Sequence, residues 1–219
     1  MKSLRLMCGV WRICFNHPSR GFMKNALLEP LRQQLLPLPD KLLPGESLYG
    51  QAAVLVLISR TPEPSLLYTK RADHLRSHAG EVCFPGGHWE PGDLHLADTA
   101  LRETWEEIGL SSYSIELLGC LEPGHTRAGT PVQPVVGTYD PHVPLVANPA
   151  ELDVIFQVPL ADFRRGIQVR TDRILRQGIE YRVPAYRYQH YEIWGFTAAI
   201  TARLLKYLDN SADVPVGVL

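Results

Sequence analysis

The 219-residue sequence lacks the features of several protein classes. It has only four cysteines, without a CxxC pair or a dense framework, which argues against a structural zinc site and a disulfide scaffold, and we expect reduced thiols: Cys8, Cys14, Cys83 and Cys120. Its longest useful apolar run covers seven residues, 52–58, whereas a bilayer span takes about 20. There is no internal repeat and no low-complexity tract. The sequence therefore predicts a globular protein without a membrane span.

Net charge is also nearly absent, because 22 basic residues oppose 23 acidic ones. The distribution is uneven: residues 1–24 hold five basic residues and no acid, which leaves 17 basic and 23 acidic residues, or −6, for the remainder. An acidic body argues against nucleic-acid binding. The basic leader has three open interpretations: a transit peptide, a disordered tail, or a start placed before a true start at Met23. We expect a cytoplasmic protein, or a mitochondrial or other organellar one if the leader is a transit peptide.

Length and a hydrophobic content of 45% fit one packed domain with extensions. Periodicity and turn signals predict helices at 27–35, 97–108 and 197–208, with Gly109 ending the second, and strands at 52–58, 65–69, 80–84, 115–121, 132–138 and 154–159. The first two strands should form a hairpin, and residues 71–79 a polar loop. This order of elements indicates an α/β or α+β sandwich. We divide the chain into a leader (1–24), an extension with a short helix (25–49), a domain (50–209) and a tail (210–219).

The most informative segment is Arg102-Glu103-Thr104-Trp105-Glu106-Glu107-Ile108-Gly109-Leu110. Residues three and four apart share a helix face, so Glu103, Glu106 and Glu107 project together and repel one another unless a cation lies among them. Carboxylate oxygens suit Mg²⁺ or Mn²⁺. Arg102, four residues before Glu106, can pair with that carboxylate. Although such helix faces are usually solvated, the turn at 84–87 just upstream favours a metal site.

That turn is Phe84-Pro85-Gly86-Gly87, in which glycines allow the backbone to approach a helix or a phosphate closely. Together, Gly-Gly, an acid, and Arg-Glu-x-x-Glu-Glu-x-Gly-Leu resemble the Nudix box of hydrolases that cleave nucleoside diphosphates linked to another moiety. Two positions depart from the pattern. Asp93 stands where the pattern has Glu, with eight residues rather than seven before Arg102, and Thr104 replaces an aliphatic residue. We do not count Asp93 as a ligand.

A second motif resembles the signature of the coenzyme A pyrophosphatase branch of the Nudix family. It reads Leu67-Tyr68-Thr69-Lys70-Arg71-Ala72, then Arg76, Gly80 and Phe84-Pro85-Gly86-Gly87, and only Tyr68 departs from it. That branch shares the longer spacing before Arg-Glu. The resemblance covers roughly residues 50–205 and implies a Nudix α/β/α sandwich with a mixed central sheet.

The resemblance implies an enzyme that binds a small molecule, coenzyme A or acyl-coenzyme A, and hydrolyses its pyrophosphate to 3′,5′-ADP and (acyl-)4′-phosphopantetheine. The implied cofactor is Mg²⁺ or Mn²⁺, which neutralises phosphate charge and activates water. Two alternatives stay open: a Nudix pyrophosphatase of NADH, ADP-ribose or capped RNA, and a nucleotide-binding Nudix regulator without turnover. The presence of all three helix glutamates argues against the regulator. A homodimer is also left open.

The predicted site residues fall into three groups. Glu103, Glu106 and Glu107 hold the metal ions and, with Arg102 and Glu151, form the catalytic set. Glu151 is the candidate general base from a later loop, although one of the helix glutamates could serve instead. Arg71, Arg76, Gly86 and Gly87 bind substrate, because arginine has the fork geometry that phosphate accepts. We expect His74, His78, His88 and His95 to lie at the surface or the substrate's edge.

Overall fold

The computed structural model describes residues 28–43, 45–176 and 178–209. The basic leader, the C-terminal tail, Cys8 and Cys14 lie outside these residues. Cys83 and Cys120 are free thiols, as expected. In the described ranges, no helix is long and apolar enough to cross a membrane.

The central sheet is mixed and has the strand order β3-β2-β1-β7-β5, with β4 pairing with β1, β6 with β7 and β8 with β2. Its strands are β1 Ala52–Ser59, β2 Ser65–Arg71, β3 Val82–Cys83, β4 Gly86–His88, β5 Ile115–Cys120, β6 Gly124–His125, β7 Pro131–Tyr139 and β8 Leu152–Pro159. Strands β1 and β7 run parallel over eight residue pairs, from Ala52↔Val132 to Ser59↔Tyr139. The remaining pairs are antiparallel.

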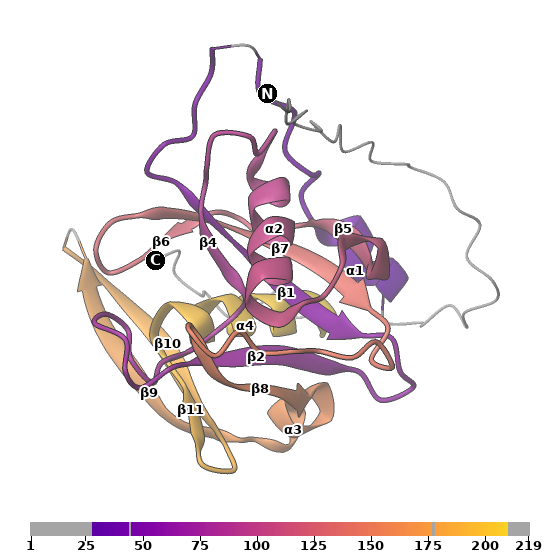
Figure 1. Cartoon of the computed structure of the whole chain (residues 1–219). Coiled ribbons are helices and arrows are strands. Elements are labelled where there is room, and N and C mark those ends of the chain that lie inside the picture. Colours follow the sequence, from indigo (N-terminus) through magenta and orange to yellow (C-terminus); the bar gives the residue numbers. More distant parts are fainter. Residues whose placement is uncertain (1–27, 44, 177, 210–219) are drawn as a thin grey trace, which may run out of the picture.

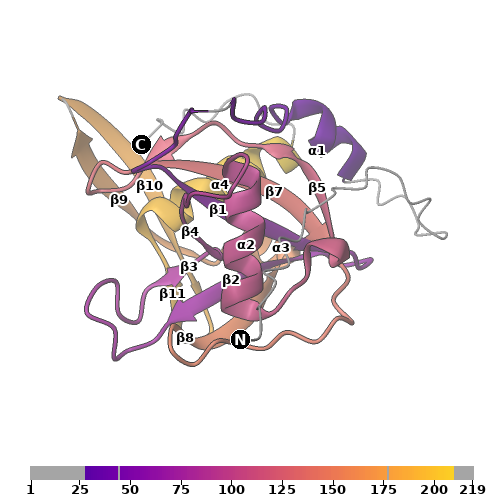
Figure 2. The same cartoon turned by 45° about the horizontal axis from the view of Figure 1, so that its top comes forward.

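Helices cover both faces of this sheet, as Figures 1 and 2 show for α2 and α4. They are α1 Leu28–Gln34, α2 Leu96–Ile108, α3 Leu160–Arg165 and α4 Gly195–Leu208, with a short 3₁₀ turn η1 at Ser112–Ser114. A second sheet consists of β9 Gln168–Arg176, β10 Ile179–Tyr188 and β11 Tyr191–Ile193.

Alternation along β1 builds two separate cores, because successive side chains of a strand point to opposite faces. Leu55 and Leu57 are fully buried in a cluster with Ala97 and Ala100 of α2. Val56 and Ile58 are fully buried in the other cluster, which holds the buried residues of α4. The expected α/β/α sandwich with a mixed central sheet is thereby confirmed.

The structure also corrects several of the element predictions, and it adds the short elements η1 and β6, which were not predicted. The strand expected at 80–84 is only Val82–Cys83, and Gly86–His88, expected in a loop, forms β4 against β1. Residues 160–193, to which the sequence assigned no element, contain α3 and the second sheet. A glycine-rich three-residue strand has little intrinsic strand propensity, so its local sequence does not predict it. It forms because it pairs with β1.

Candidate active site

Helix α2 carries the acidic motif, and local signals fix both of its ends. His95 caps the N-terminus, since its Nδ1 accepts a hydrogen bond of 3.0 Å from the Asp98 backbone N–H. At the other end Gly109 adopts φ 68° and donates its N–H to the Trp105 carbonyl over 2.9 Å, as predicted for a helix stop. The placement of His95 at the surface was wrong, because it is 9% exposed and serves as a cap.

Arg102 forms ion pairs with three carboxylates, those of Asp93, Glu103 and Glu106. Its Nη1 donates to Glu103 Oε1 over 3.0 Å and to Glu106 Oε2 over 3.1 Å. Its Nε and Nη2 donate to the two carboxylate oxygens of Asp93 over 3.1 and 3.2 Å, and Nη2 also reaches the His88 carbonyl over 2.9 Å. Such a bidentate pair fixes the plane of the guanidinium, and with it the two glutamates that Arg102 holds.

Asp93 therefore acts through Arg102, although it departs from the general motif. Its side chain is only 7% exposed. It accepts hydrogen bonds from Thr99 Oγ1 over 2.8 Å and from the Glu90 backbone N–H over 3.2 Å, besides those of Arg102. Both oxygens of Asp93 accept hydrogen bonds, so this carboxylate fixes the position of Arg102.

The three glutamates of α2 have different surroundings. Glu107 is 1% exposed, and its Oε2 has no hydrogen-bond partner among the described residues. Burial raises the pKa of Glu107 to about 8, and the charges of Glu103 and Glu151 add to the effect, while Arg71 and a backbone hydrogen bond from Gly86 oppose it. Burial also raises the pKa of Glu103, against the opposing effect of Arg102. Glu106 is half exposed and pairs with Arg102.

The two glycines of the upstream turn lie against different partners. A Cβ on Gly87 would lie 2.3 Å from Glu103 Oε1, so the carboxylate rests on the bare Cα of this residue. A Cβ on Gly86 would lie 2.3 Å from the Ala53 carbonyl oxygen and 2.6 Å from Val54 Cα, both in β1. Gly87 thus makes room for the acidic site, and Gly86 for the pairing of β4 with β1.

Two residues distant in sequence complete the site. Glu151, in the turn before β8, is half-buried, and its charge raises the pKa of both Glu103 and Glu107. Its backbone carbonyl accepts the Ala72 N–H over 2.9 Å, which ties it to the end of β2. Arg71 ends β2, acts on Glu107 electrostatically, and has a buried Nε without a hydrogen-bond partner in the described structure.

Arg76 is the predicted site residue that the structure does not bring to this cluster. It is exposed in the loop between β2 and β3. Unlike Arg71, it is not among the main causes of the pKa shift of Glu107. Its side chain is therefore exposed to solvent, away from the glutamate cluster.

The metal cradle predicted from Glu103, Glu106 and Glu107 is not formed in advance. Across residues 28–209, as far as they are described, no three acidic, histidine or cysteine side chains are grouped closely enough to hold an ion. Arg102 instead takes one oxygen each of Glu103 and Glu106. A divalent ion nevertheless fits the chemistry, because the buried, unpartnered Oε2 of Glu107 is a hard oxygen donor beside two further carboxylates.

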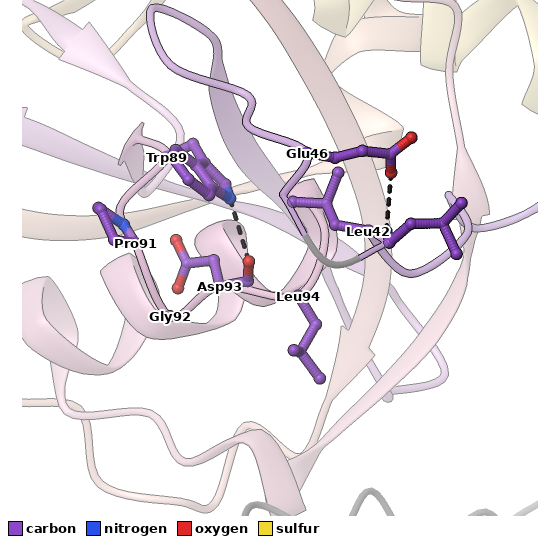
Figure 3. Close-up of a pocket in the computed structure, with 8 residues that line it drawn as sticks. Leu42, Glu46, Trp89, Pro91, Gly92, Asp93 and Leu94 are labelled. Carbon is purple, nitrogen blue, oxygen red and sulfur yellow. Dashed lines mark hydrogen bonds between the residues drawn. The ribbon is translucent and has the colours of Figure 1, made fainter.

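A pocket of about 410 Å³, lined in part by Asp93, lies where the N-terminal extension meets the loop that leads into α2 (Figure 3). Leu42, Leu43 and Glu46 line it from the extension, and Trp89 and residues 91–94 from the loop. The Trp89 indole N–H donates to the Asp93 carbonyl over 3.1 Å. None of the site glutamates lines this pocket, so the pocket is separate from the charged site.

The fold and this carboxylate-rich site define a pyrophosphohydrolase, and comparisons with known proteins agree. The NUDIX domain matches residues 49–169. The chain is 40% identical over 176 residues to the uncharacterized Nudix hydrolase NudL of Yersinia pestis (strain Pestoides F), covering 78% of this chain and 88% of that protein. The match to NudL of Yersinia pseudotuberculosis serotype O:1b has the same identity and coverage. The chain belongs to the Nudix family of hydrolases.

Solved structures with a similar arrangement include a MutT/nudix family protein from Enterococcus faecalis, with a TM-score of 0.48 and 17% identity over 78% of this chain and 66% of that chain. A C. elegans Ap4A hydrolase binary complex has a TM-score of 0.45 and 20% identity over 52% of this chain and 84% of that chain.

Proposed function

We propose that this Nudix hydrolase cleaves the pyrophosphate bond of coenzyme A and acyl-coenzyme A to 3′,5′-ADP and (acyl-)4′-phosphopantetheine. The main support for the proposal is that the upstream signature lies next to the glutamates of the site. In the upstream signature, the charge of Arg71 acts on Glu107. The next residue, Ala72, donates its backbone N–H to the Glu151 carbonyl. The segment that resembles the coenzyme A branch therefore borders the site for pyrophosphate chemistry.

In this proposal Glu103, Glu106 and Glu107 hold Mg²⁺ or Mn²⁺. A divalent ion bound there would neutralise charge on the pyrophosphate and activate the attacking water. Arg102 positions Glu103 and Glu106 through its hydrogen bonds of 3.0 and 3.1 Å. The bare Cα of Gly87 gives Glu103 its space, and Gly86 places this turn against β1.

Two further groups act on substrate and water. Glu151, next to Glu103 and Glu107, accepts a proton from water as the general base. Arg71 has a buried Nε without a protein partner in the described ranges, which suits a substrate phosphate oxygen. Arg76, exposed in the loop beyond, binds the additional phosphate on the ribose of coenzyme A.

The runner-up is hydrolysis of another nucleoside diphosphate derivative, such as NADH, ADP-ribose or a capped RNA end, since the same carboxylates serve any of these bonds. The exposed residue Arg76 favours coenzyme A, because its charge matches a phosphate that NADH and ADP-ribose lack. Binding without turnover is disfavoured by the complete set of Glu103, Glu106 and Glu107.

The test is incubation of the purified chain with Mg²⁺ or Mn²⁺ and, separately, coenzyme A, acetyl-coenzyme A, NADH, ADP-ribose and capped RNA, with chromatography of the products. We expect 3′,5′-ADP to form faster than any other product. Intact coenzyme A alongside cleaved NADH or ADP-ribose would refute the substrate assignment. Glu106→Gln should abolish turnover with the fold retained. Glu116→Gln is the matched control, because Glu116 likewise pairs with an arginine, Arg32, but lies on β5.

We further assign the catalytic domain to residues 50–209 of a cytoplasmic enzyme and expect the leader to take no part in catalysis. A chain that begins at Met23 should then retain full activity in the same assay. A loss of activity on this truncation, with an unchanged melting temperature, would place residues 1–22 in the functional unit.

A further inference from the structure

The segment between β7 and β8 passes the C-terminal end of α2 and is tied to it (Figure 2). The Val146 backbone N–H donates to the Ile108 carbonyl over 2.9 Å, and the Asn148 N–H donates to the Glu107 carbonyl over 2.8 Å. These bonds satisfy two of the last carbonyls of the helix, which have no partner within the helix itself. The backbone of Asn148 is thereby fixed relative to Glu107.

The side chain of Asn148 continues this connection to Glu151. Its Nδ2 donates to Glu151 Oε1 over 3.2 Å, and its Oδ1 accepts the Ala150 N–H over 3.1 Å. Its carbonyl accepts the N–H groups of Glu151 and Leu152 over 3.0 and 2.8 Å. The two side-chain bonds fix the amide's orientation, since a flip would set a donor against the Ala150 N–H and an acceptor against a carboxylate.

Repulsion makes such a restraint necessary. Glu151 is half-buried, and its charge acts unfavourably on the charged forms of Glu103 and Glu107. A glutamate side chain with free rotamers would turn away from two like charges toward solvent. The hydrogen bond from Asn148 opposes that rotation, and the Ala72 N–H holds the backbone of Glu151 from the other side.

We propose that Asn148 is a positioning residue of this hydrolase. Its side-chain amide holds the Glu151 carboxylate at the site. Its backbone N–H, bonded to the Glu107 carbonyl, fixes where that carboxylate lies relative to Glu107. The inference rests on the proposed role of Glu151 as the general base. It assigns to Asn148 no contact with substrate. Its effect is to keep the base aligned with the water that it deprotonates.

The experiment is a double-mutant cycle with Asn148→Asp and Glu151→Gln, measured on whichever compound of the substrate panel the wild-type chain cleaves fastest. Aspartate keeps the Oδ1 acceptor for the Ala150 N–H but replaces the donor to Glu151 with an acceptor. We expect Asn148→Asp to lower kcat by about 10- to 100-fold with little change in KM, because misplacing a catalytic group costs on this order. In the Glu151→Gln background the same substitution should have almost no further effect.

Thermal unfolding separates positioning from a structural role. Asn148→Asp should melt within a few degrees of the wild type, since the turn and the backbone bonds remain. Asp140→Ala is the control in the same loop: it removes a comparable acceptor, whose Oδ1 bonds the His142 N–H over 2.9 Å, and should leave kcat unchanged.

Wild-type kcat for Asn148→Asp, or an equal loss in both backgrounds, would overturn the inference. Full activity of Glu151→Gln would overturn it together with the role of the base. Failure of the proposed substrate is a separate result, because the panel uses the wild-type chain alone and the cycle uses the compound that this chain cleaves.

Discussion

The two faces of the central sheet use polar groups in opposite ways. On the α4 face the buried hydroxyl of Tyr68 has a partner within the core: it lies 2.8 Å from Thr201 Oγ1, and the Tyr68 ring stacks on Phe84 at a centroid distance of 4.7 Å. On the α2 face Glu107 is equally buried, but its Oε2 has no partner in the described structure. Tyr68 thus contributes a satisfied polar group to its core, whereas Glu107 retains a buried carboxylate oxygen without a partner.

This contrast indicates which side of the sheet carries the chemistry. Burying a carboxyl group without a partner is costly, so such a group persists where a ligand supplies the missing interaction. Glu107 meets this description and lies next to Glu103, Glu151 and Arg71. Four experiments test this contrast between the faces.

The largest effect should come from the two adjacent glycines. Gly86→Ala sets a Cβ against the backbone of β1 and should cost about 3 kcal/mol or more of folding free energy, because neither strand can yield. Gly87→Ala meets only the end of the flexible Glu103 side chain, so stability should change by less than about 1 kcal/mol, while kcat falls about 100-fold as Glu103 is displaced. Urea unfolding and turnover check both. Similar behaviour of the two variants would contradict the separate roles.

The next effect concerns pH in the presence of a chelator. The folded-state pKa of Glu107, about 8, lies above its unfolded value of 4.5, so between these values the native state binds more protons than the unfolded state. The free energy of unfolding should therefore fall as pH rises from about 5 to 8, by about 4 kcal/mol. Glu107→Gln should remove this slope, and added Mg²⁺ should reduce it in the wild type. Thermal unfolding across this pH range measures the slope. An identical slope in the wild type and in Glu107→Gln would refute the assignment.

A smaller effect is expected from exchanging arginine for lysine on each face. Lysine cannot reproduce the fork that Arg102 presents to Asp93, so Arg102→Lys should cost about 2 kcal/mol and lower kcat about 10-fold. Arg203 of α4, which donates to the Glu122 carbonyl over 2.6 Å, is the matched position. Arg203→Lys should reduce stability alone. Loss of turnover in Arg203→Lys would show that the α4 face contributes to catalysis.

The smallest effect is that of Tyr68→Phe. The variant keeps the ring stacking but loses the hydroxyl, while Thr201 retains its bond of 2.9 Å to the Thr197 carbonyl. We expect a loss of about 1 kcal/mol by urea unfolding and unchanged kcat. A decrease in turnover would contradict the view that Tyr68, the one departure from the upstream signature, serves packing.

Sequence patterns predicted the parts of the fold that local forces decide. Strands β1, β2, β5, β7 and β8 and helices α1, α2 and α4 lie close to their expected positions, because each has a clear apolar period or a strong stop signal. The second sheet was missed, since β9 and β10 are rich in charged residues that pair with one another, such as Arg170 with Asp172 and Arg187 with Glu192. The cap formed by His95 was missed because histidine is not among the preferred capping residues.

The sequence alone encodes the helix that carries Glu103, Glu106 and Glu107, its stop at Gly109 and the Gly-Gly turn beside it, because these features depend on spacings of a few residues. Tertiary contacts, in contrast, settle which glutamate is buried and which residues join it. Pairing of β2 with β8 brings Arg71 opposite Leu152, next to Glu151, and the backbone bond of Asn148 to Glu107 closes the group. Such contacts join positions far apart in the chain, and sheet registry, which local propensity does not encode, sets them.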